Sequence, residues 1–238
     1  MHEIINNSKI LILRACGLHD EKAECDNIKN QCEMYGLEVH DHCPKSNEEI
    51  DIILNKGFTY DYIYLSSHGS AEGFENEDRS IKYIWFEFGI TLCSSMCMNE
   101  ECIVMLSCCR GGLNQIAYDL IYCCTKISYI IGPRQSLYPH EMLISFNILL
   151  FNLIHRNLDP IVSCEKIRSG ADIRFICFDR LETIAEAAFI LRTQEYDDTD
   201  IAELNEALKK TNETTKPTQE EKPCLELTAP TEAKKRFA

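Results

Sequence analysis

CIVMLSCCRGG, residues 102–112, begins as an unbroken apolar run and ends in a glycine-rich turn. Short runs of this kind, without alternating polar residues, are typical of strands that are covered on both faces in a parallel sheet. Five other segments read in the same way, the last two more weakly: Lys9 to Ala15, Tyr60 to Ser66, Ile127 to Gly132, Leu37 to His42 and Arg174 to Phe178. The sequence therefore predicts a sheet of six strands.

Segments of helical period lie between these runs. They are Glu21 to Tyr35, Ser46 to Asn55, which opens with a capping box, Leu113 to Cys124, and Pro139 to His155. Strands that alternate with helices form βαβ units. We therefore expect an α/β fold with a doubly wound, mostly parallel six-stranded sheet and helices on both of its faces.

The character of the chain changes after Arg192. We expect one domain over residues 1–195, followed over residues 196–238 by a short helix, Ile201 to Lys210, and a disordered acidic tail. The tail, from Thr211 onward, is polar and nearly free of aromatic residues, so it cannot bury enough surface to order itself.

The composition of the chain limits the classes of partner it can have and the compartment in which we expect it. With 38 acidic against 24 basic residues the net charge is -14, which argues against nucleic acid as a partner. The longest apolar stretch, Met142 to Ile154, is too short and too polar to span a membrane. The N-terminal residues lack the pattern of a signal peptide, so the 14 cysteines are expected to be reduced thiols in a cytoplasmic protein. No paired C-x-x-C spacing is present, and we expect neither a metal nor another cofactor.

Two strand ends carry residues that could do chemistry, since working residues in such sheets follow the carboxyl ends of the strands. His68 follows the run that ends at Ser66, and Cys109 follows the run that ends at Ser107. An imidazole near a thiol can take its proton and later donate one to a leaving amine. If the two strands are neighbours, these side chains converge at one edge of the sheet, and backbone N–H groups of the adjoining turns face a developing oxyanion.

Neither residue is a specific signal by itself. A lone histidine at a strand end is usually structural, and a buried cysteine is usually inert packing. The pair is more specific, because both residues lie at strand ends and both adjoin glycine-containing turns.

Two motifs give a more specific indication. Leu65 to Gly69 (LSSHG) resembles the His-Gly motif of the caspase-like (clan CD) cysteine proteases, and Ser107 to Gly111 (SCCRG) resembles their Q-A-C-R-G pentapeptide. Leu106 to Cys109 also resembles the Leu-Ser-Ala-Cys of the CHAT group, the bacterial relatives of caspases. Gly132 to Arg134 and Tyr138 to His140 are similar to a loop of that group. We therefore favour a CHAT-type protease over a true caspase.

The resemblance implies a role for individual residues. Cys109 matches the nucleophile, His68 the general base, and the backbone of Gly69 and Cys109 the donors of the oxyanion hole. Because side chains alternate along an extended strand end, Cys108 is then expected to point back into the packing. Ser107 replaces the glutamine that lines the caspase pocket for the residue before the cut, so the caspase preference does not carry over.

The resemblance also places two loops at the substrate pocket, one after the first strand and one after the strand that follows the nucleophile. Arg14, Asp20, Arg134 and Gln135 occupy these loops. The arginines would favour an acidic substrate residue and Asp20 a basic one, but solvated loop charges are an equally good explanation of each. The preference at the cut site stays open.

The expected function is cleavage of a protein substrate by a cysteine endopeptidase, in a bacterial signalling or antiviral defence setting such as regulated cell death. A separately encoded activator or recruiting partner is expected, and no membrane partner. One alternative is a catalytically silent caspase-like scaffold. Another is a flavodoxin-like ligand or receiver domain, but residues 14–17 (RACG) offer neither a phosphate-binding turn nor an acidic cluster. The acidic segment Ser70 to Ser80 is expected to be a mobile loop.

Overall fold

The computed structural model describes residues 8–17 and 19–193 of the chain. Its central sheet has six strands in the order β2-β1-β3-β7-β8-β9, and all neighbouring pairs are parallel except β8 and β9. The strands are β1 (Lys9–Arg14), β2 (Glu38–His42), β3 (Tyr60–Ser66), β7 (Met98–Ser107), β8 (Ile127–Pro133) and β9 (Phe175–Asp179). The predicted fold class and all six predicted strands are confirmed.

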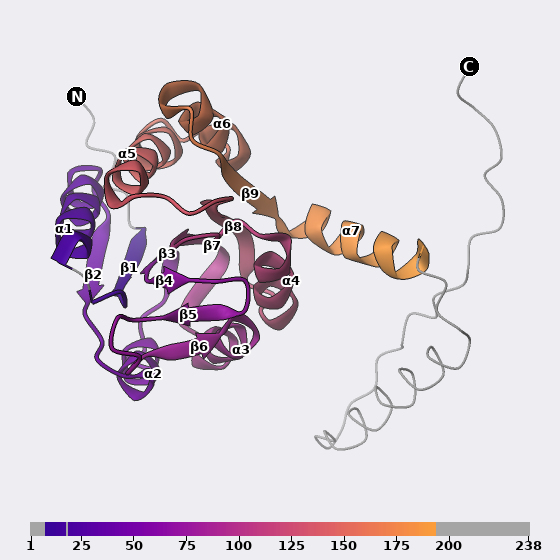
Figure 1. Cartoon of the computed structure of the whole chain (residues 1–238), viewed down its shortest axis with the longest axis horizontal. Coiled ribbons are helices and arrows are strands. Elements are labelled where there is room, and N and C mark those ends of the chain that lie inside the picture. Colours follow the sequence, from indigo (N-terminus) through magenta and orange to yellow (C-terminus); the bar gives the residue numbers. More distant parts are fainter. Residues whose placement is uncertain (1–7, 18, 194–238) are drawn as a thin grey trace. The chain divides into compact units, whose positions relative to one another are not determined.

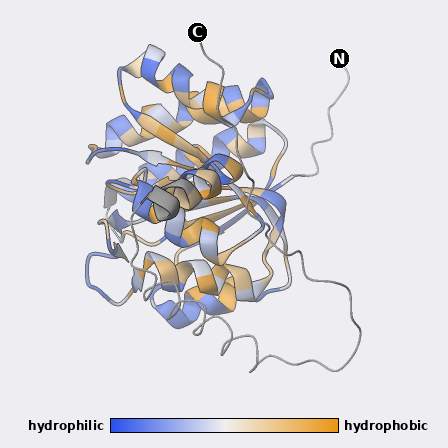
Figure 2. Cartoon of the chain, turned by 90° about the vertical axis from the view of Figure 1, so that its right-hand side faces the viewer, coloured by the Kyte–Doolittle hydropathy of each residue, from blue (hydrophilic) through white to orange (hydrophobic). Residues whose placement is uncertain are grey.

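Helices cover both faces of the sheet (Figure 1). One layer holds α1 (His19–Met34), α5 (Pro139–Leu150) and α6 (Pro160–Ala171), and the other holds α2 (Asn47–Leu54), α3 (Trp85–Ser95) and α4 (Asn114–Cys123). The alternation of side chains along β1 divides the core accordingly. Ile10 and Ile12 pack into the first layer, whereas Leu11 and Leu13 pack into the second. Figure 2 shows the apolar strands between the two helical layers.

The predicted helices form with small changes at their ends. Ser46 caps α2, as its capping-box pattern indicates, and its hydroxyl accepts a hydrogen bond from the backbone N–H of Glu49 at 3.3 Å. The predicted helix from Pro139 to His155 is divided, because α5 ends at Leu150 and a π-helical turn, η1 (Phe151–His155), follows. Helices α3, α6 and α7 (Arg180–Thr193) are additional to the prediction.

The segment that begins at His68 contributes to a second, antiparallel sheet. The expected loop from Ser70 to Ser80 therefore contains a strand, while its mobility stays a prediction. The sheet consists of β4 (His68–Gly69), β5 (Gly73–Glu75) and β6 (Lys82–Ile84). Phe74 anchors it, since its ring is 2% exposed and packs against Tyr83 and Trp85. The indole N–H of Trp85 donates to the carbonyl of Ser70 at 2.9 Å.

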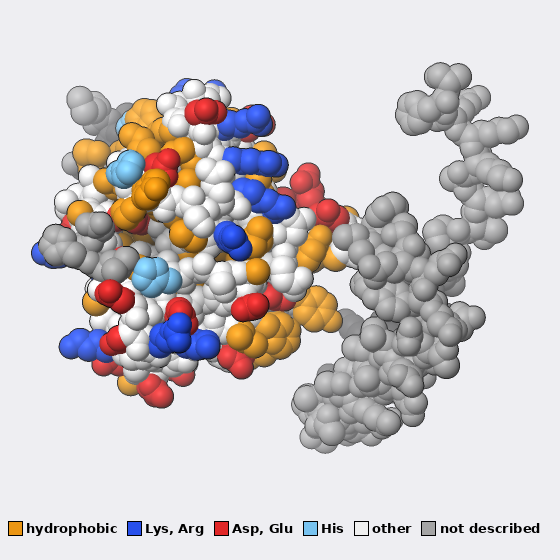
Figure 3. Space-filling model, viewed as in Figure 1, with side chains coloured by type: hydrophobic (Ala, Val, Ile, Leu, Met, Phe, Trp, Pro, Cys, Tyr) orange, Lys and Arg blue, Asp and Glu red, His pale blue; other side chains and the backbone are white. Residues whose placement is uncertain are grey.

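The remaining large-scale features concern the ends and the surface of the chain. The described residues up to Ile190 form one compact unit, which contains both sheets. The predicted short helix and tail over residues 196–238 lie outside the described residues. Over residues 8–17 and 19–193, no helix is both long enough and apolar enough to cross a membrane. Figure 3 shows acidic and basic side chains interspersed over the face that is seen in Figure 1.

Candidate active site

Pairing of β3 with β7 brings the two predicted catalytic residues to one edge of the sheet. Ser66 pairs with Ser107, and the N–H of Ser67 donates to the carbonyl of Ser107 at 3.2 Å. The segments that follow, with His68 and Cys109, therefore leave the sheet side by side. A Cβ on Gly69 would lie 2.7 Å from the carbonyl oxygen of Cys109, so only glycine allows this approach of the two backbones.

The adjacent cysteines point in different directions, as predicted. Cys108 is 1% exposed and belongs to the core on the α2–α3–α4 side of the sheet. Burial raises the pKa of its thiol far above the ordinary value, so it stays protonated. Cys109 is half-buried and lines a cavity together with His68. Cys109 is therefore the one of the two thiols that a substrate can reach beside the imidazole.

The turn after Cys109 is held by contacts with the segment that follows β8. Arg110 adopts a left-handed conformation with φ 62°, which is costly for a residue with a side chain and turns the chain sharply beyond Cys109. The N–H of Gly112 donates to the carbonyl of Pro133 at 2.8 Å. The guanidinium of Arg134 donates to the carbonyl of Gly112 at 3.2 Å and to Asn114 Oδ1 at 2.9 Å.

Two backbone N–H groups are available next to the thiol. The N–H of Cys109 has no acceptor among the residues that the structure describes. The N–H of Ser70 donates to the carbonyl of Gly73, and hydrogen-bonded pairs alternate with non-bonded pairs along an antiparallel ladder. Gly69, which pairs with Phe74, is therefore in a non-bonded pair, and its N–H points away from β5.

A second thiol, which sequence reasoning missed, contacts the imidazole. Cys16 Sγ lies 3.5 Å from His68 Nε2. Cys16 follows β1, and β3 lies between β1 and β7, so His68 stands between thiols from two different strand ends. The carboxylate of Glu21 holds the turn that carries Cys16, because its two oxygens accept from the N–H groups of Cys16 and Gly17 at 2.8 Å each.

A cavity of about 170 Å³ lies beneath the two thiols and the imidazole. Its walls are the strand ends of β3 and β7, the first turns of α1, and the segment from Leu137 to Met142. Two carboxyl groups of α1, on Glu21 and Glu24, line it and are each 7% exposed. His68 also lines a larger cavity of about 420 Å³, which runs along β4, β5 and β6.

The predicted pocket residues divide into two groups. Ser107 lines the smaller cavity and donates its hydroxyl to Glu24. Arg14 lies outside this cavity and is already paired, with Asp41 at 2.5 Å and with Asp26 at 2.7 Å. Hydrogen bonding to Asp41 raises the pKa of its guanidinium. The charge of Arg14 is therefore balanced within the protein, and its role in substrate binding stays a prediction.

The other predicted pocket residues do not line the cavity either. Arg134 and Gln135 hold the turn after the thiol, since the carbonyl of Gln135 accepts from the N–H of Arg110 at 3.3 Å. Asp20 lies in the first turn of α1, and its side chain is not among those that the structure describes. The sequence did not indicate that Glu21 and Glu24 line the cavity, because acidic residues in a helix usually lie on its solvent-exposed face.

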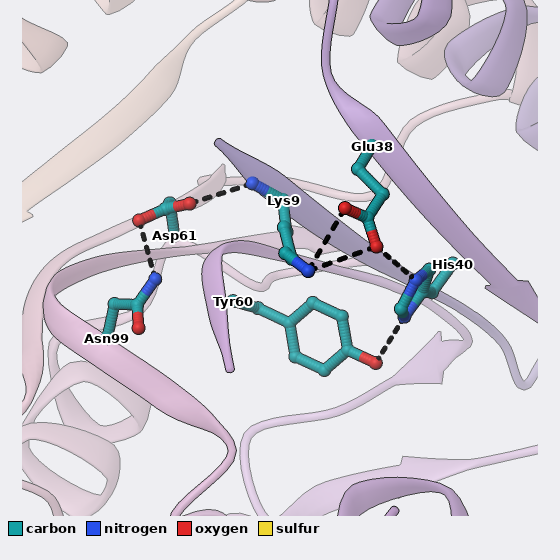
Figure 4. A network of polar contacts seen from close by, with 6 residues as sticks. All are labelled: Lys9, Glu38, His40, Tyr60, Asp61 and Asn99. Atoms are coloured by element: carbon teal, nitrogen blue, oxygen red, sulfur yellow. Dashed lines mark hydrogen bonds and ion pairs between the residues drawn. The ribbon is translucent and has the colours of Figure 1, made fainter. Parts of the chain in front are cut away.

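A second polar network lies at the opposite, amino end of the sheet (Figure 4). His40 contacts Glu38 and the hydroxyl of Tyr60 at 2.9 Å each, and Lys9 contacts the carboxylate of Glu38 at 3.0 Å. Asp61 accepts hydrogen bonds from the N–H of Lys9 at 2.7 Å and from Asn99 at 2.8 Å. No thiol takes part in this network as drawn, so its histidine lacks the partner that His68 has.

Comparison with known proteins agrees with this arrangement at the level of the fold. No protein-family model matches the sequence, and a search of curated proteins finds no relative. Among solved structures, the chain is similar to a secreted C11 cysteine protease from Bacteroides thetaiotaomicron, called iotapain, with a TM-score of 0.58 and 10% sequence identity. The likeness covers 76% of this chain and 68% of that one. At this identity it establishes that the chain has a caspase-like fold.

Proposed function

We propose that the chain is a cysteine endopeptidase in which Cys109 is the nucleophile and His68 the general base. The observation that carries the proposal is that both side chains line one cavity at the ends of the adjacent strands β3 and β7. The likeness to a cysteine protease of the same fold supports it.

The reaction follows from the positions of these groups. Cys109 Sγ attacks the carbonyl carbon of the peptide bond while His68 takes the thiol proton. The N–H groups of Gly69 and Cys109 donate to the oxyanion of the tetrahedral intermediate. The C–N bond then breaks, and His68 returns the proton to the leaving amine. Water, activated by His68, finally hydrolyses the thioester and releases the acid product with the free thiol.

The biological setting is part of the same proposal. We place the enzyme in the CHAT group, on the resemblance of Leu106 to Cys109 (LSCC) and of the loop with Gly132 to Arg134 and Tyr138 to His140. Its substrate is a protein, and a separately encoded partner activates or recruits it. The setting is cytoplasmic signalling or antiviral defence, and neither nucleic acid nor a membrane is a partner. The net charge of -14 supports the exclusion of nucleic acid.

A catalytically silent scaffold is the second candidate. One observation favours it: among the described residues His68 is hydrogen-bonded to the thiol of Cys16, and no hydrogen bond joins it to Cys109. Catalytic hydrogen bonds are often long before a substrate binds, so the same observation is compatible with an enzyme at rest.

An assay of peptide cleavage by variants of Cys109, His68 and Cys108 distinguishes an active protease from a silent scaffold. A peptide library digested by the protein with its activator, and read by mass spectrometry, should yield products that Cys109→Ala abolishes. His68→Ala should lower the rate by about 10² to 10⁴-fold, the range for a general base. Cys108→Ala is the matched control: it should keep most of the activity and cost about 1 kcal/mol of packing. Full activity in Cys109→Ala would exclude the proposed mechanism, and no cleavage by the intact protein would favour the scaffold.

A further inference from the structure

The outer face of the small sheet carries three titratable side chains in one row. His68 pairs with Glu75 across β4 and β5, and Glu75 pairs with Lys82 across β5 and β6. Phe74 and Tyr83, which precede Glu75 and follow Lys82, are buried in the core. Because successive side chains of a strand point to opposite faces, the side chains of the row point away from that core. All three line the cavity of about 420 Å³.

The row runs away from the thiol of Cys109. Strand β4 pairs with β5 on one side, and on the other it approaches the turn with Cys109, as the 2.7 Å between a Cβ on Gly69 and the carbonyl oxygen of Cys109 shows. Figure 1 shows β4, β5 and β6 side by side in this order. Neighbouring strands lie about 4.8 Å apart, so Lys82 lies about 10 Å beyond His68. From the thiol outward, the order is imidazole, carboxylate and ammonium.

The two charges beyond His68 differ in their partners. The carboxylate of Glu75 pairs with the guanidinium of Arg79 at 3.4 Å. The ammonium of Lys82 has no carboxylate within ion-pair distance among the residues that the structure describes. Asn47 fixes the backbone of Lys82, because its Oδ1 accepts from the N–H at 2.9 Å and its Nδ2 donates to the carbonyl at 2.8 Å. Glu72 also lines the cavity, but it lies in the turn between β4 and β5, outside the row. Lys82 therefore offers a positive charge at a fixed place in the cavity wall.

The reaction determines which part of a substrate lies over this face. In the proposed mechanism the acyl half of the peptide stays on Cys109 Sγ, while His68 returns the proton to the leaving amine. The amine half therefore extends from His68 on the side away from the thiol, where β5 and β6 follow. An extended peptide advances about 3.3 Å per residue, so about three residues span the distance to Lys82.

We propose that the outer face of the small sheet binds the substrate segment that follows the cleaved bond, and that Lys82 selects an acidic side chain at the third residue of that segment. The inference rests on the proposed function. A carboxylate at the third residue forms a charge-assisted hydrogen bond with the ammonium, whereas a basic residue there meets a like charge. The first residue after the cut lies nearer to Glu75, whose charge Arg79 balances, so charge matters less at that position.

A binding experiment tests the site without any chemistry. Dye-labelled pentapeptides with a free amino end, which imitate the amine half, are titrated with the full-length Cys109→Ala variant and followed by fluorescence anisotropy. We expect a peptide with Asp at its third residue to bind about 3 to 5-fold more tightly than one with Asn there, the upper range for an exposed ion pair. The difference should shrink in about 0.5 M salt. Lys82→Gln in the same background should remove it, and moving the Asp to the first residue should remove it as well.

A matched control and a cleavage assay separate the ways in which the two proposals can fail. Lys166→Gln changes the net charge equally at an exposed position of α6, in the other helical layer, and should leave the Asp preference unchanged. Equal binding of the Asp and Asn peptides, or a preference that survives in Lys82→Gln, would overturn the role of Lys82. An Asp preference that depends on Lys82, together with no cleavage by the intact protein, would keep the binding face and remove the protease. Cleavage of the peptide library without a preference for an acidic third residue would do the reverse.

Discussion

His68 is the residue on which the candidate site depends, because its ring lies between the turns that carry Cys16 and Cys109. The contact with Cys16 Sγ at 3.5 Å engages Nε2 and leaves Nδ1 for a second partner. A ring that is held on one side loses less orientational freedom when a substrate binds. In the proposed enzyme, Cys16 is therefore a positioning residue, which acts through His68 and does not attack the substrate.

Replacing Cys16 tests this role. Cys16→Ala is expected to lower kcat by about 5 to 10-fold with KM nearly unchanged, on the scale of one hydrogen bond that matters only in the transition state. Cys16→Ser should restore most of kcat, since a hydroxyl can also contact Nε2. Cys25→Ala, a fully buried thiol of α1, is the control and should reduce stability without affecting kcat. A rise in KM with constant kcat would assign Cys16 to substrate binding instead.

Glu24→Gln is expected to stabilise the protein near pH 7. Its carboxyl has a pKa above the ordinary 4.5 in the folded state, because it is buried. A raised pKa means that the proton is held more tightly in the folded than in the unfolded chain. This contribution to stability is complete below the unfolded pKa and is lost as the pH rises through the folded one. The gain from the neutral amide should therefore be present near pH 7, shrink as the pH falls through the raised folded pKa toward about 4.5, and be absent below that value.

Urea unfolding at the two pH values measures this effect. Wild type and Glu24→Gln are compared near pH 7 and below pH 4.5, and Glu33→Gln serves as the exposed control. The same gain at both pH values would mean that the charge of Glu24 is not its cause.

At the scale of residues, the sequence indicated the positions of His68 and Cys109 better than the groups that surround them. His68, Cys109 and the buried Cys108 follow from strand ends and glycines, which are local signals. Cys16 and Glu24 reach the cavity only through the packing of β1 and α1 against β3 and β7. Arg14 looked available in the sequence, because its partners Asp26 and Asp41 lie 12 and 27 positions away.

At the scale of elements, the small sheet β4–β5–β6 determines where His68 points, since His68 is the first residue of β4. Its three strands are too short to show an alternating pattern of apolar and polar residues. In the sequence, the one buried aromatic residue, Phe74, lies among Glu72, Glu75 and Glu77, so the segment looks polar. This is why the segment reads as a loop. Helix α6, by contrast, begins with Asp159 before Pro160, a recognisable start signal that the prediction did not use.

Removing the anchor should loosen the small sheet. Phe74→Ala is expected to lower the free energy of unfolding by about 3 to 5 kcal/mol, as for other large aromatic residues that are fully buried. The amide of Ser70, protected in wild type by its bond to Gly73, should then exchange with deuterium faster. Tyr122→Ala, whose ring is 81% exposed on α4, is the control. Rapid exchange at Ser70 in the wild-type protein would instead confirm the mobile-loop prediction.

At the scale of the whole molecule, the net charge of -14 creates a long-range field that attracts cationic peptides. Salt screens such a field over about 10 Å at 0.1 M ionic strength. If the substrate residue is basic, kcat/KM for an Arg peptide should fall several-fold between about 0.05 and 0.5 M salt. The same measurement on a neutral peptide should change little, and an identical response of both peptides would exclude steering by charge.

The location of Glu24 has a consequence for how this chain can change over time. The proposed reacting groups follow β3 and β7, whereas the carboxyl groups in the cavity belong to one turn of α1. If the chain is the proposed protease, exchange of one helical side chain can therefore change the chemistry of the cavity while the strands and the reaction stay the same. Substitutions in α1 could therefore alter the substrate preference during evolution without altering the proposed reaction. In the same way, the preference could be engineered by randomising a few positions of this one helix.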